Sequence, residues 1–460
     1  MRLTQERAWL AREFVDAENQ AGEPPALLAP PPFFDNSPNR WNSARQMSAT
    51  SQIIDEVLPA KLEEQLPRWL ELPVYRSRFN GNEGIHSPSG FFKLPFITKQ
   101  HIRDGFPQNF LSHGQSLETL LANAQVELEH TSGTSEERTP VLFGMGWWNA
   151  QESLALRLNR RIAHVLDEYP NARRAVLTTP ICNGTACHSR WTPRSARIYQ
   201  ESLFVNQARI PFLIEETELA RMADEITEWS PQFLDLDPVH GAWFALYCER
   251  NGIRFPSLQF VNCSYEFVGV VHRKILKRVF GVPVFNLYGS TETGHLLMED
   301  ENGVMQPSVE TAFLEVLNPD SNGVGDLAVT TLSNDFMPLL RYRIGDLIER
   351  RGTTSAANYI VHGRARDALR TPDDRRVTTW QVDQCFADVD GIAHYQLRQA
   401  ENGDCALRYV PDAKAPTSED LREVTGRLEK LLQTPNGITI ESSNLLVPAP
   451  SGKFRLTCRE

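Results

Sequence analysis

Short apolar runs alternate with longer amphipathic stretches through most of this chain of 460 residues. The short runs are rich in Val, Leu and Phe, which predicts strands, at residues 175–178, 258–261, 282–285 and 325–332. The longer stretches carry apolar residues at helical spacing, which predicts helices, at residues 53–70, 148–166, 215–229 and 267–279. Strands that alternate with helices from about residue 125 onward predict an α/β fold with a mostly parallel sheet.

The two ends of the chain depart from this pattern. Residues 1–20 are typical of a helix, and the proline-rich residues 24–38 predict irregular or extended structure. The alternation of strands and helices changes after Gly363, where 97 residues remain, enough for one small α+β unit. We therefore expect a large domain over residues 1–363 and a small domain over residues 364–460.

Composition and charge narrow the classes of function. The chain is 41% hydrophobic and 23% charged, as in ordinary globular proteins, and carries a formal charge of −11 without a basic run. Nucleic acid is therefore excluded as the main partner. We expect no membrane span, because no apolar stretch approaches about 18 residues. We expect no signal peptide, because residues 1–7 are typical of a polar helix start. Seven scattered cysteines, an odd number, favour a reduced, cytoplasmic setting.

One loop is unusually rich in small and hydroxyl-bearing residues: Thr131, Ser132, Gly133, Thr134 and Ser135. Small residues allow the backbone to approach a ligand, and hydroxyl and amide groups can bind phosphate oxygens. The loop lacks the Gly-Lys-Ser/Thr ending of a Walker loop. An ordinary solvated serine and threonine turn explains the same residues, so the loop alone leaves both interpretations open.

A second motif combines an aromatic ring, two hydroxyls and a carboxylate after an apolar run: Tyr288, Gly289, Ser290, Thr291 and Glu292. Open α/β sheets bind ligands beyond the carboxyl ends of their strands. A carboxylate in that position suits Mg²⁺, which binds one or two carboxylates together with substrate phosphates. Tyr288 would stack on a base. The alternative is a strand-end turn with a solvated glutamate.

Three further motifs lie toward the end of the chain. Asp346 follows a glycine after a predicted strand, where a carboxylate would accept two ribose hydroxyls. Arg364 lies in the sequence Gly-Arg-Ala-Arg-Asp, and Lys453 lies in Pro-Ser-Gly-Lys-Phe-Arg near the C-terminus. Taken singly, they are also explained by a surface turn, a charged hairpin and a solvated lysine.

Together, the five motifs resemble, in this order, those of the adenylate-forming superfamily of acyl-CoA synthetases, aryl ligases and luciferases. The sequences Leu-Pro-Phe-Ile-Thr-Lys at residues 94–99 and Met-Pro-Leu-Leu-Arg-Tyr-Arg-Ile-Gly-Asp at residues 337–346 resemble signatures of its phenylacetate–CoA ligase subfamily. The resemblance covers roughly residues 90–460. It implies an α/β fold with a large N-terminal adenylation domain of mixed sheets and helices and a small mobile α+β C-terminal domain.

The resemblance also implies an activity. A carboxylate attacks the α-phosphate of ATP, pyrophosphate leaves, and a thiol of CoA or of a carrier-protein phosphopantetheine then displaces AMP. The expected acid is aromatic, such as benzoate, a hydroxybenzoate or phenylacetate. The expected cofactors are ATP and Mg²⁺, and a homodimer is left open. The rival interpretations are a degenerate nucleotide-binding protein without turnover, and an enzyme that transfers the acyl group to a protein or an amine.

Roles carry over by position. The 131–135 loop would cradle the departing phosphates. Thr291 would contact the α-phosphate and Glu292 would hold Mg²⁺. Asp346 with Arg364 would bind the ribose. Lys453 would bridge the carboxylate and the α-phosphate during adenylation, since its compact ammonium suits a residue delivered by a moving domain.

Further positions complete the expected site. Ser264, Tyr265 and Glu266 would form an adenine-contacting turn. Arg366 occupies the hinge position, although a plain surface residue explains it equally well. Three residues are assigned to the acid pocket: Asn183, His188 and Phe267. His188 would hydrogen-bond a ring hydroxyl, unless it is a satisfied core histidine, and a zinc site with Cys182 and Cys187 is disfavoured because structural zinc sites bring together four closely spaced ligands.

The chain departs from the family pattern in two places. Glu136, Glu137 and Arg138 stand where the phosphate loop usually has Gly-x-Pro. After the hinge, residues 371–377 place aspartates where a glycine is expected, which would crowd a pantetheine arm and weighs against free CoA. Three arginines form a basic cluster that would attract an acidic carrier protein, namely Arg370, Arg375 and Arg376. A solvated charge run explains the same cluster.

Overall fold

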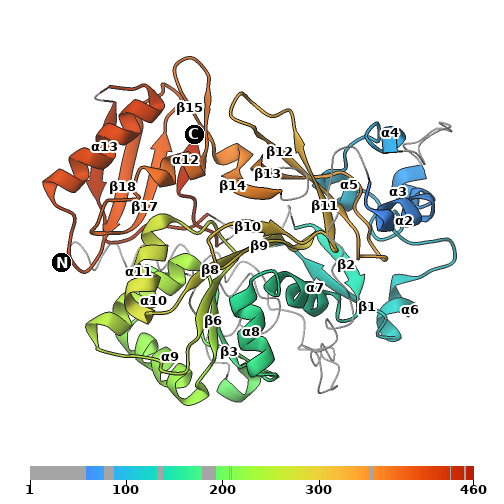
Figure 1. Cartoon of the computed structure of the whole chain (residues 1–460), viewed down its shortest axis with the longest axis horizontal. Helices are drawn as coiled ribbons and strands as arrows, with labels where there is room; N and C mark the ends of the chain where they lie inside the picture. The colour runs from blue at the N-terminus through green and yellow to red at the C-terminus, as the bar shows by residue number, and fades with distance from the viewer. Residues whose placement is uncertain are drawn as a thin grey trace, which may run out of the picture. The chain divides into compact units, whose positions relative to one another are not determined.

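The computed structural model describes residues 58–76, 88–131, 138–178, 193–206, 208, 210–352, 357–435, 437–449 and 452–459. The helix expected at residues 1–20 and the proline-rich residues 24–38 lie outside this description. At the centre is a twelve-stranded sheet in the order β11-β12-β13-β14-β10-β9-β8-β7-β6-β3-β5-β4 (Figure 1). It has a parallel half and an antiparallel half that meet at β8.

Strands of the parallel half are nearly continuous apolar runs, as expected for strands covered on both faces. They are β3 (Arg174–Leu177), β5 (Ser202–Phe204), β6 (Phe233–Leu236), β7 (Phe260–Cys263) and β8 (Val284–Ser290), with β4 (Ile198–Tyr199) antiparallel at the edge. Every residue of β6 and β7 is buried. The predicted strands at 175–178, 258–261 and 282–285 are therefore confirmed, with shifted ends.

Helices cover both faces of this half. One face packs Phe233 and Phe260 against α7 (Trp147–Leu156) and α8 (Arg160–Glu168). The other face packs Leu234 and Val261 against α9 (Glu216–Trp229), α10 (Pro238–Arg250) and α11 (Val270–Phe280). The helix expected at 148–166 is two helices, because the Asn159 side chain accepts hydrogen bonds from the amides of Arg161 and Ile162 and so starts a new helix.

The expectation of a mostly parallel sheet is wrong beyond β8. The remaining strands pair antiparallel with one another: β9 (Gly294–Glu299), β10 (Met305–Pro307), β11 (Ala312–Leu317), β12 (Val324–Thr331), β13 (Tyr342–Arg351) and β14 (Asn358–Arg364). A parallel crossover needs a dozen or more residues, and β8 and β9 are separated by residues 291–293 alone. The short connections therefore dictate hairpins.

The N-terminal part of the description packs on the antiparallel half. Its elements are α2 (Ala60–Leu70), α3 (Pro73–Arg76), α4 (Pro88–Phe91), α5 (Lys99–Arg103), α6 (Leu117–Ala122) and the hairpin β1 (Val126–His130) and β2 (Pro140–Gly144). Trp69, Phe91 and Leu142 share one buried cluster with Phe313 and Leu339. This cluster brings the predicted 94–99 motif into the same core as the 337–346 motif.

After β14, the chain forms a four-stranded sheet in the order β19-β18-β17-β20. The elements of this C-terminal segment are β15 (Leu369–Arg370), β16 (Arg376–Val377), α12 (Thr379–Gln384), β17 (Ile392–Gln399), β18 (Cys405–Pro411), α13 (Ser418–Leu432), β19 (Ile438–Ser442) and β20 (Thr457–Arg459). The Phe386 and Tyr395 rings stack at 3.8 Å in its own buried cluster.

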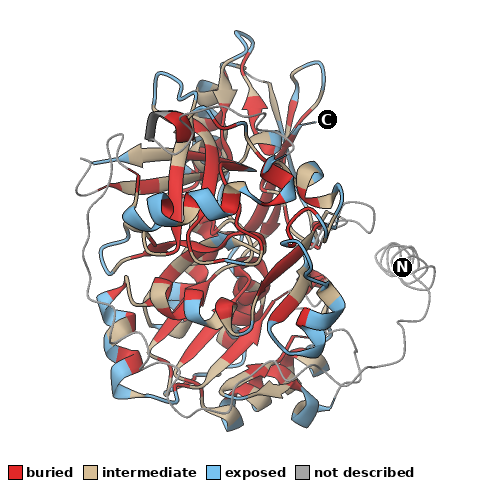
Figure 2. Cartoon of the chain, turned by 90° about the vertical axis from the view of Figure 1, so that its right-hand side faces the viewer, coloured by how far each residue is buried: buried red, intermediate tan, exposed pale blue. Residues whose placement is uncertain are grey.

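Buried residues line most strands of the twelve-stranded sheet, and exposed residues lie mainly on the outward faces of the helices (Figure 2). Within the described ranges, no helix has both the length and the apolar character needed to cross a membrane.

Candidate active site

The turn after β8 presents most of the second predicted motif. The strand runs through Gly289 and ends at Ser290, so the chain turns two residues later than expected. A Cβ added to Gly289 would lie 2.2 Å from the Gly294 carbonyl oxygen, so the close approach of β8 and β9 requires glycine here. Hydroxyls of Ser290 and Thr293 lie 3.0 Å apart across the turn, and Thr291 is half-buried between them.

Glu292 is 3% exposed and has two partners on one oxygen. The Tyr342 hydroxyl donates to Oε1 at 2.9 Å, and Lys99 Nζ lies 3.1 Å from the same atom. Burial raises the pKa of Glu292, but the charge of Lys99 and the hydrogen bond from Tyr342 outweigh burial and hold the pKa below its ordinary value. The carboxylate is therefore an anion at neutral pH.

Lys99 reaches Glu292 because Arg341 anchors the segment before it. The Arg341 guanidinium donates to the Leu94 carbonyl at 2.7 Å and lies 4.4 Å from the centre of the Phe96 ring. Ile97 pairs in parallel with Tyr342, which places Lys99 at the start of α5. Sequence reasoning did not assign Lys99 or Tyr342 to the site, although both lie in the two motifs that carried the resemblance.

Asp346 forms a second group with the predicted ribose residues. It lies inside β13, not after a strand as expected, where Gly345 adopts a φ of 92° beside a shift in strand register. The Tyr288 hydroxyl donates to Asp346 Oδ2 at 2.5 Å, and Arg364 Nε lies 3.0 Å from Oδ1. Burial and the neighbouring Asp346 hold the pKa of Tyr288 well above its ordinary value, so the phenol keeps its proton.

Lys453 meets the predicted adenine turn across 188 positions of sequence. Its Nζ donates to the Tyr265 carbonyl at 2.7 Å, and the Phe454 amide donates to Glu266 Oε1 at 2.8 Å. Tyr265 holds a φ of 72°, an uncommon conformation for a residue with a side chain. The resemblance alone placed these segments together, since nothing in the local pattern of either one predicts the contact.

Glu266 lies beside a second carboxylate, Asp237. Burial and the proximity of Asp237 raise the pKa of Glu266 well above its ordinary value. The pKa of Asp237 is lowered despite its burial, because it faces His240 and caps α10 through the amides of Val239 and His240. Glu266 therefore holds the proton of the pair. The two acids in Leu-Asp-Leu-Asp at the end of β6 were a sequence signal that went unused.

The phosphate-loop prediction falls on the turn of the β1–β2 hairpin. At its base, the Thr131 amide donates to the Thr139 carbonyl and the Thr139 amide donates to Thr131 Oγ1, both at 3.0 Å. The predicted residues 132–135 lie outside the described residues, as do the acid-pocket residues Asn183 and His188. Phe267, the third predicted pocket residue, packs against the buried cluster of the C-terminal segment.

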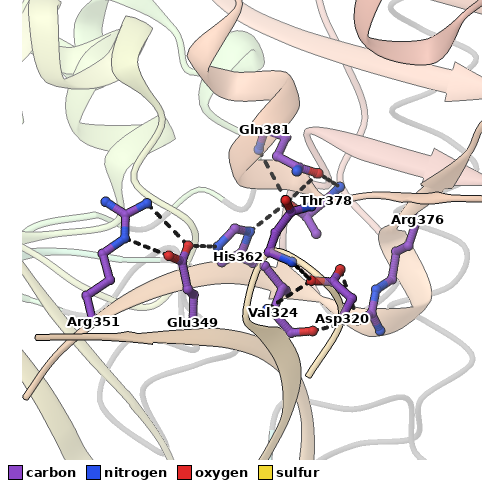
Figure 3. A network of polar contacts seen from close by, with 9 residues as sticks. Asp320, Val324, Glu349, Arg351, His362, Arg376, Thr378 and Gln381 are labelled. Carbon is purple, nitrogen blue, oxygen red and sulfur yellow. Dashed lines mark hydrogen bonds and ion pairs between the residues drawn. The ribbon is translucent and has the colours of Figure 1, made fainter. Parts of the chain in front are cut away.

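Polar contacts cross the predicted hinge at Arg366, whose side chain is 71% exposed. His362 lies between the Thr378 hydroxyl at 2.8 Å and Glu349 Oε2 at 3.1 Å (Figure 3). Arg376 donates to the Val324 carbonyl at 3.0 Å. These contacts join β12, β13 and β14 to the C-terminal segment.

The predicted site residues fall into two groups: Tyr288 lies with Asp346 and Arg364, and Lys453 contacts the segment Tyr265–Glu266. Among the described residues, no group of three or more His, Cys, Asp or Glu side chains is arranged to hold a metal ion. Cys182, Cys187 and His188 lie outside this statement.

Sequence comparison gives a limited match. No family model matches the chain. It is 24% identical to Protein CapK of Staphylococcus aureus over 192 residues, which are 40% of this chain and 42% of CapK. The match therefore spans less than half the length of that relative.

Structural comparison is more extensive. A 2-hydroxyisobutyryl-CoA ligase in the postadenylation state, in complex with 2-HIB-AMP, is similar with a TM-score of 0.60 and 14% identity over 88% of this chain and 92% of that chain. The anthranilate CoA ligase AuaEII in complex with anthranoyl-AMP is similar with a TM-score of 0.51 and 14% sequence identity. The similarity covers 72% of this chain and 65% of that chain. The protein described here thus has the fold of the adenylate-forming acyl-CoA ligases.

Proposed function

We propose that this protein is an acid–thiol ligase, which converts a carboxylic acid and ATP to an acyl-adenylate and pyrophosphate and then transfers the acyl group to a thiol. The observation that carries the proposal is the contact of Lys453 Nζ with the Tyr265 carbonyl, 2.7 Å across 188 positions of sequence. It brings the Lys453 ammonium to the carboxyl end of the parallel strands, where α/β folds bind ligands.

Adenylation must bring two anions together while charge builds on the leaving pyrophosphate. Positioned cations and dipoles meet this demand best in a water-poor site. Lys453 would supply the charge between the acid and the α-phosphate, with Thr291 as a hydroxyl donor to that phosphate. Loop 131–135 would bind the departing phosphates, since the Thr131–Thr139 contacts close its base.

The ribose would bind at Asp346. A carboxylate is the acceptor that a vicinal diol needs, and Arg364 Nε lies 3.0 Å from Asp346 Oδ1. Tyr288 donates to the same carboxylate and is thereby fixed in one orientation beside it. The adenine would lie against the 264–266 turn.

The donor set fits Mg²⁺ in the manner of a phosphate-bound cation. Lys99 and Tyr342 both contact Glu292 Oε1, which leaves Oε2 as the oxygen for a metal ion. A single carboxylate suffices for Mg²⁺ when phosphate oxygens supply further ligands. Glu292 would hold the ion, whose chemistry is to neutralise charge on the phosphates; Lys99 would add a second positive charge from the protein itself.

For the second half-reaction, we propose that residues 364–460 form a domain that reorients at Arg366, with CoA as the acceptor. The arginines that would attract a carrier protein are engaged within the protein: Arg375 donates to the Leu431 carbonyl at 2.8 Å and Arg376 to Val324 at 3.0 Å. Arg370 donates to the Asp374 carbonyl at 2.8 Å. These contacts favour CoA over an acidic carrier protein.

Acid-dependent exchange between ATP and labelled pyrophosphate tests the proposal directly. A panel of aromatic, aliphatic, hydroxy and amino acids should contain at least one that supports exchange. If none does while ATP still binds, the degenerate nucleotide-binding interpretation holds instead. Release of AMP with CoA, with a phosphopantetheinylated carrier protein and with amines then identifies the acceptor, and an aromatic acid remains the first choice in the panel.

A further inference from the structure

Six polar side chains, four of them buried and two partly buried, form a cluster next to the Lys453 contact, and the proposed chemistry uses only one of them. They come from α7, β3, β6, β7, the turn after β7 and β9, and are Glu152, Arg174, Asp235, Asn262, Tyr265 and His295. Tyr265 is the residue whose carbonyl accepts from Lys453, and His295 pairs with Gly289 between β8 and β9. The cluster therefore spans the space between the two halves of the candidate site.

Asp235 is the least satisfied charge in this cluster. Arg174 lies 2.6 Å from Glu152 but 3.5 Å from Asp235, so its guanidinium belongs mainly to Glu152. Donors from Asn262, Ser264 and Tyr265 reach Asp235 at 3.2 to 3.3 Å. Charge-assisted hydrogen bonds are typically about 2.7–2.9 Å, so Asp235 retains capacity to accept a closer donor.

Two polar atoms of this cluster have no hydrogen-bond partner within the described part of the chain. Asn262 Oδ1 and His295 Nε2 are buried without a hydrogen bond, in side chains that are 1% and 8% exposed. The His295 ring packs edge-on against Trp148 at 4.8 Å, which fixes its plane. A buried polar atom left unpaired costs about 1–3 kcal/mol, so two in one cluster call for a ligand or water that pairs them.

The cluster offers acceptors. Arg174 lies closer to Glu152 than to Asp235, so the Asp235 carboxyl shares its cation with Glu152, and the Asn262 amide oxygen is buried without a hydrogen bond among the described residues. His295 lies close enough to Glu152 and Arg174 to feel both charges, and burial lowers its pKa to about 4, so it is a neutral imidazole at neutral pH. A hydroxyl or an amine on the ligand is the group that complements such a set.

We propose that this cluster recognises a hydrogen-bond donor on the acid, so that the substrate is a hydroxy- or amino-substituted carboxylic acid. An unsubstituted acid such as benzoate or phenylacetate would leave Asn262 Oδ1 and His295 Nε2 unpaired beside it. A site built to hydrogen-bond a substrate group rejects analogues that lack it more strongly than an apolar pocket distinguishes shapes. This inference rests on the proposed ligase activity.

Matched acid pairs in the pyrophosphate exchange assay test the inference. Benzoate is compared with the hydroxy- and aminobenzoates, and propionate with lactate and alanine. At least one donor-bearing acid should exceed its parent by about tenfold or more in kcat/KM, and the hydroxy and amino members separate the two sources of the donor. Equal or better exchange with every parent acid overturns the inference alone, whereas no exchange with any acid overturns the ligase proposal and the inference with it.

Substitutions then test whether Asp235 causes the preference for acids that carry a hydrogen-bond donor. Asp235→Asn should reduce the ratio of kcat/KM between donor-bearing and parent acids by about tenfold, with the KM for ATP unchanged. Ser202→Ala is the matched control, because the Ser202 hydroxyl accepts from Arg174 Nε at 2.8 Å without contacting Asp235. The control should keep the preference within about twofold.

A preference that survives in Asp235→Asn, or that is lost equally in Ser202→Ala, contradicts the assignment. Should Asp235→Asn fail to fold by its thermal melt, His295→Phe carries the same expectation. It preserves the ring contact with Trp148 and removes the unpaired nitrogen.

Discussion

Two glutamates of the candidate site differ in protonation state: Glu292 is ionised, whereas Glu266 is protonated. The difference comes from the residues that surround each side chain. Glu292 faces Lys99 and the Tyr342 hydroxyl, and its pKa is held below the ordinary value. Glu266 faces Asp237, and its pKa is raised well above that value. Both are enclosed, so burial favours protonation of each, and only Glu292 has a cation to overcome it.

The difference in protonation state implies different roles for the Glu292 region and the Glu266 region. An anionic Glu292 provides a carboxylate for a cation on the phosphate side. A protonated Glu266 accepts from the Phe454 amide and thereby holds the segment that carries Lys453, without offering that lysine a full counter-charge. Lys453 is then available to interact with the anionic groups of the substrate. The two regions are distinguished by substitutions that separate charge from shape.

Removal of the Lys453 ammonium should have the largest effect. Lys453→Ala is expected to lower adenylation by about a thousandfold or more, because a point charge between two anions acts mainly in the transition state. ATP binding and transfer from a preformed acyl-adenylate should change far less. Pyrophosphate exchange, equilibrium nucleotide binding and single-turnover transfer measure the three quantities. Equal losses in all three would refute the role of Lys453 as the adenylation cation.

Glu292→Gln keeps the shape of the side chain and removes the charge that Lys99 faces. Exchange should fall about a hundred- to a thousandfold, as for loss of one preorganised electrostatic group. The dependence on Mg²⁺ concentration should shift to higher values, because the proposed ligand oxygen is weakened. Lys99→Met is the matched variant, since it leaves the Glu292 carboxylate buried without its cation. A Glu292→Gln protein with unchanged exchange and Mg²⁺ dependence would remove Glu292 from the site.

Sequence reasoning predicted three strands of the parallel half, at 175–178, 258–261 and 282–285, because short apolar runs are typical of strands buried on both faces. It did not predict β6 at Phe233–Leu236. It also assembled Asp346 with Arg364, since both lie in motifs of known order. The strand predicted at 325–332 is confirmed as β12, but the antiparallel pairing of this half was missed, although β8 and β9 are joined by three residues alone.

The partners of the two glutamates could not be read from local patterns. Lys99 and Glu292 lie on separate elements and meet through the Ile97–Tyr342 bridge, a pairing that no local periodicity encodes. Asp237 and Glu266 meet because β6 and β7 run in parallel, and the register Leu236 to Cys263 brings their ends together. Charge states in this site are therefore properties of the tertiary structure, whereas residue types were available from the sequence.

A buried histidine pair near Lys453 should make the free energy of unfolding depend on pH. His272 Nε2 and His394 Nδ1 lie 2.9 Å apart between α11 and β17, among Phe212 and Phe454. Burial lowers the pKa of His272 to about 4, although Asp237 opposes the shift, and lowers that of His394 further. The neutral forms are favoured in the fold, so their stabilisation is complete above the unfolded pKa of about 6.5 and is lost as the pH falls through the folded pKa.

The free energy of unfolding should therefore fall by about 2 kcal/mol from His272 alone between about pH 7.5 and pH 5. Denaturant titrations at both pH values measure the change. His272→Asn should flatten this dependence while the carboxylates that titrate in the same range remain. An unchanged pH dependence in the variant would show that the histidine pair is solvated or already protonated in the folded protein.

Glu266→Gln should have the smallest effect and is the sharpest test of the contrast. The amide mimics a protonated carboxyl: its oxygen can accept from the Phe454 amide and its NH₂ can donate toward Asp237. Exchange at neutral pH should stay within about threefold of the unmodified protein, against a hundredfold or greater loss for the same chemical change at Glu292.

The two Glu→Gln variants also differ in their pH profiles. A raised pKa for Glu266 means that the contact is stable at low pH and weakens as the pH rises through that pKa, because the ionised carboxylate then repels Asp237. Glu266→Gln cannot ionise, so the alkaline limb of its exchange profile should extend to higher pH. If Glu266→Gln instead loses as much activity as Glu292→Gln, then Glu266 works as an anion, and Lys453 is held by a salt bridge that the acyl-adenylate must displace.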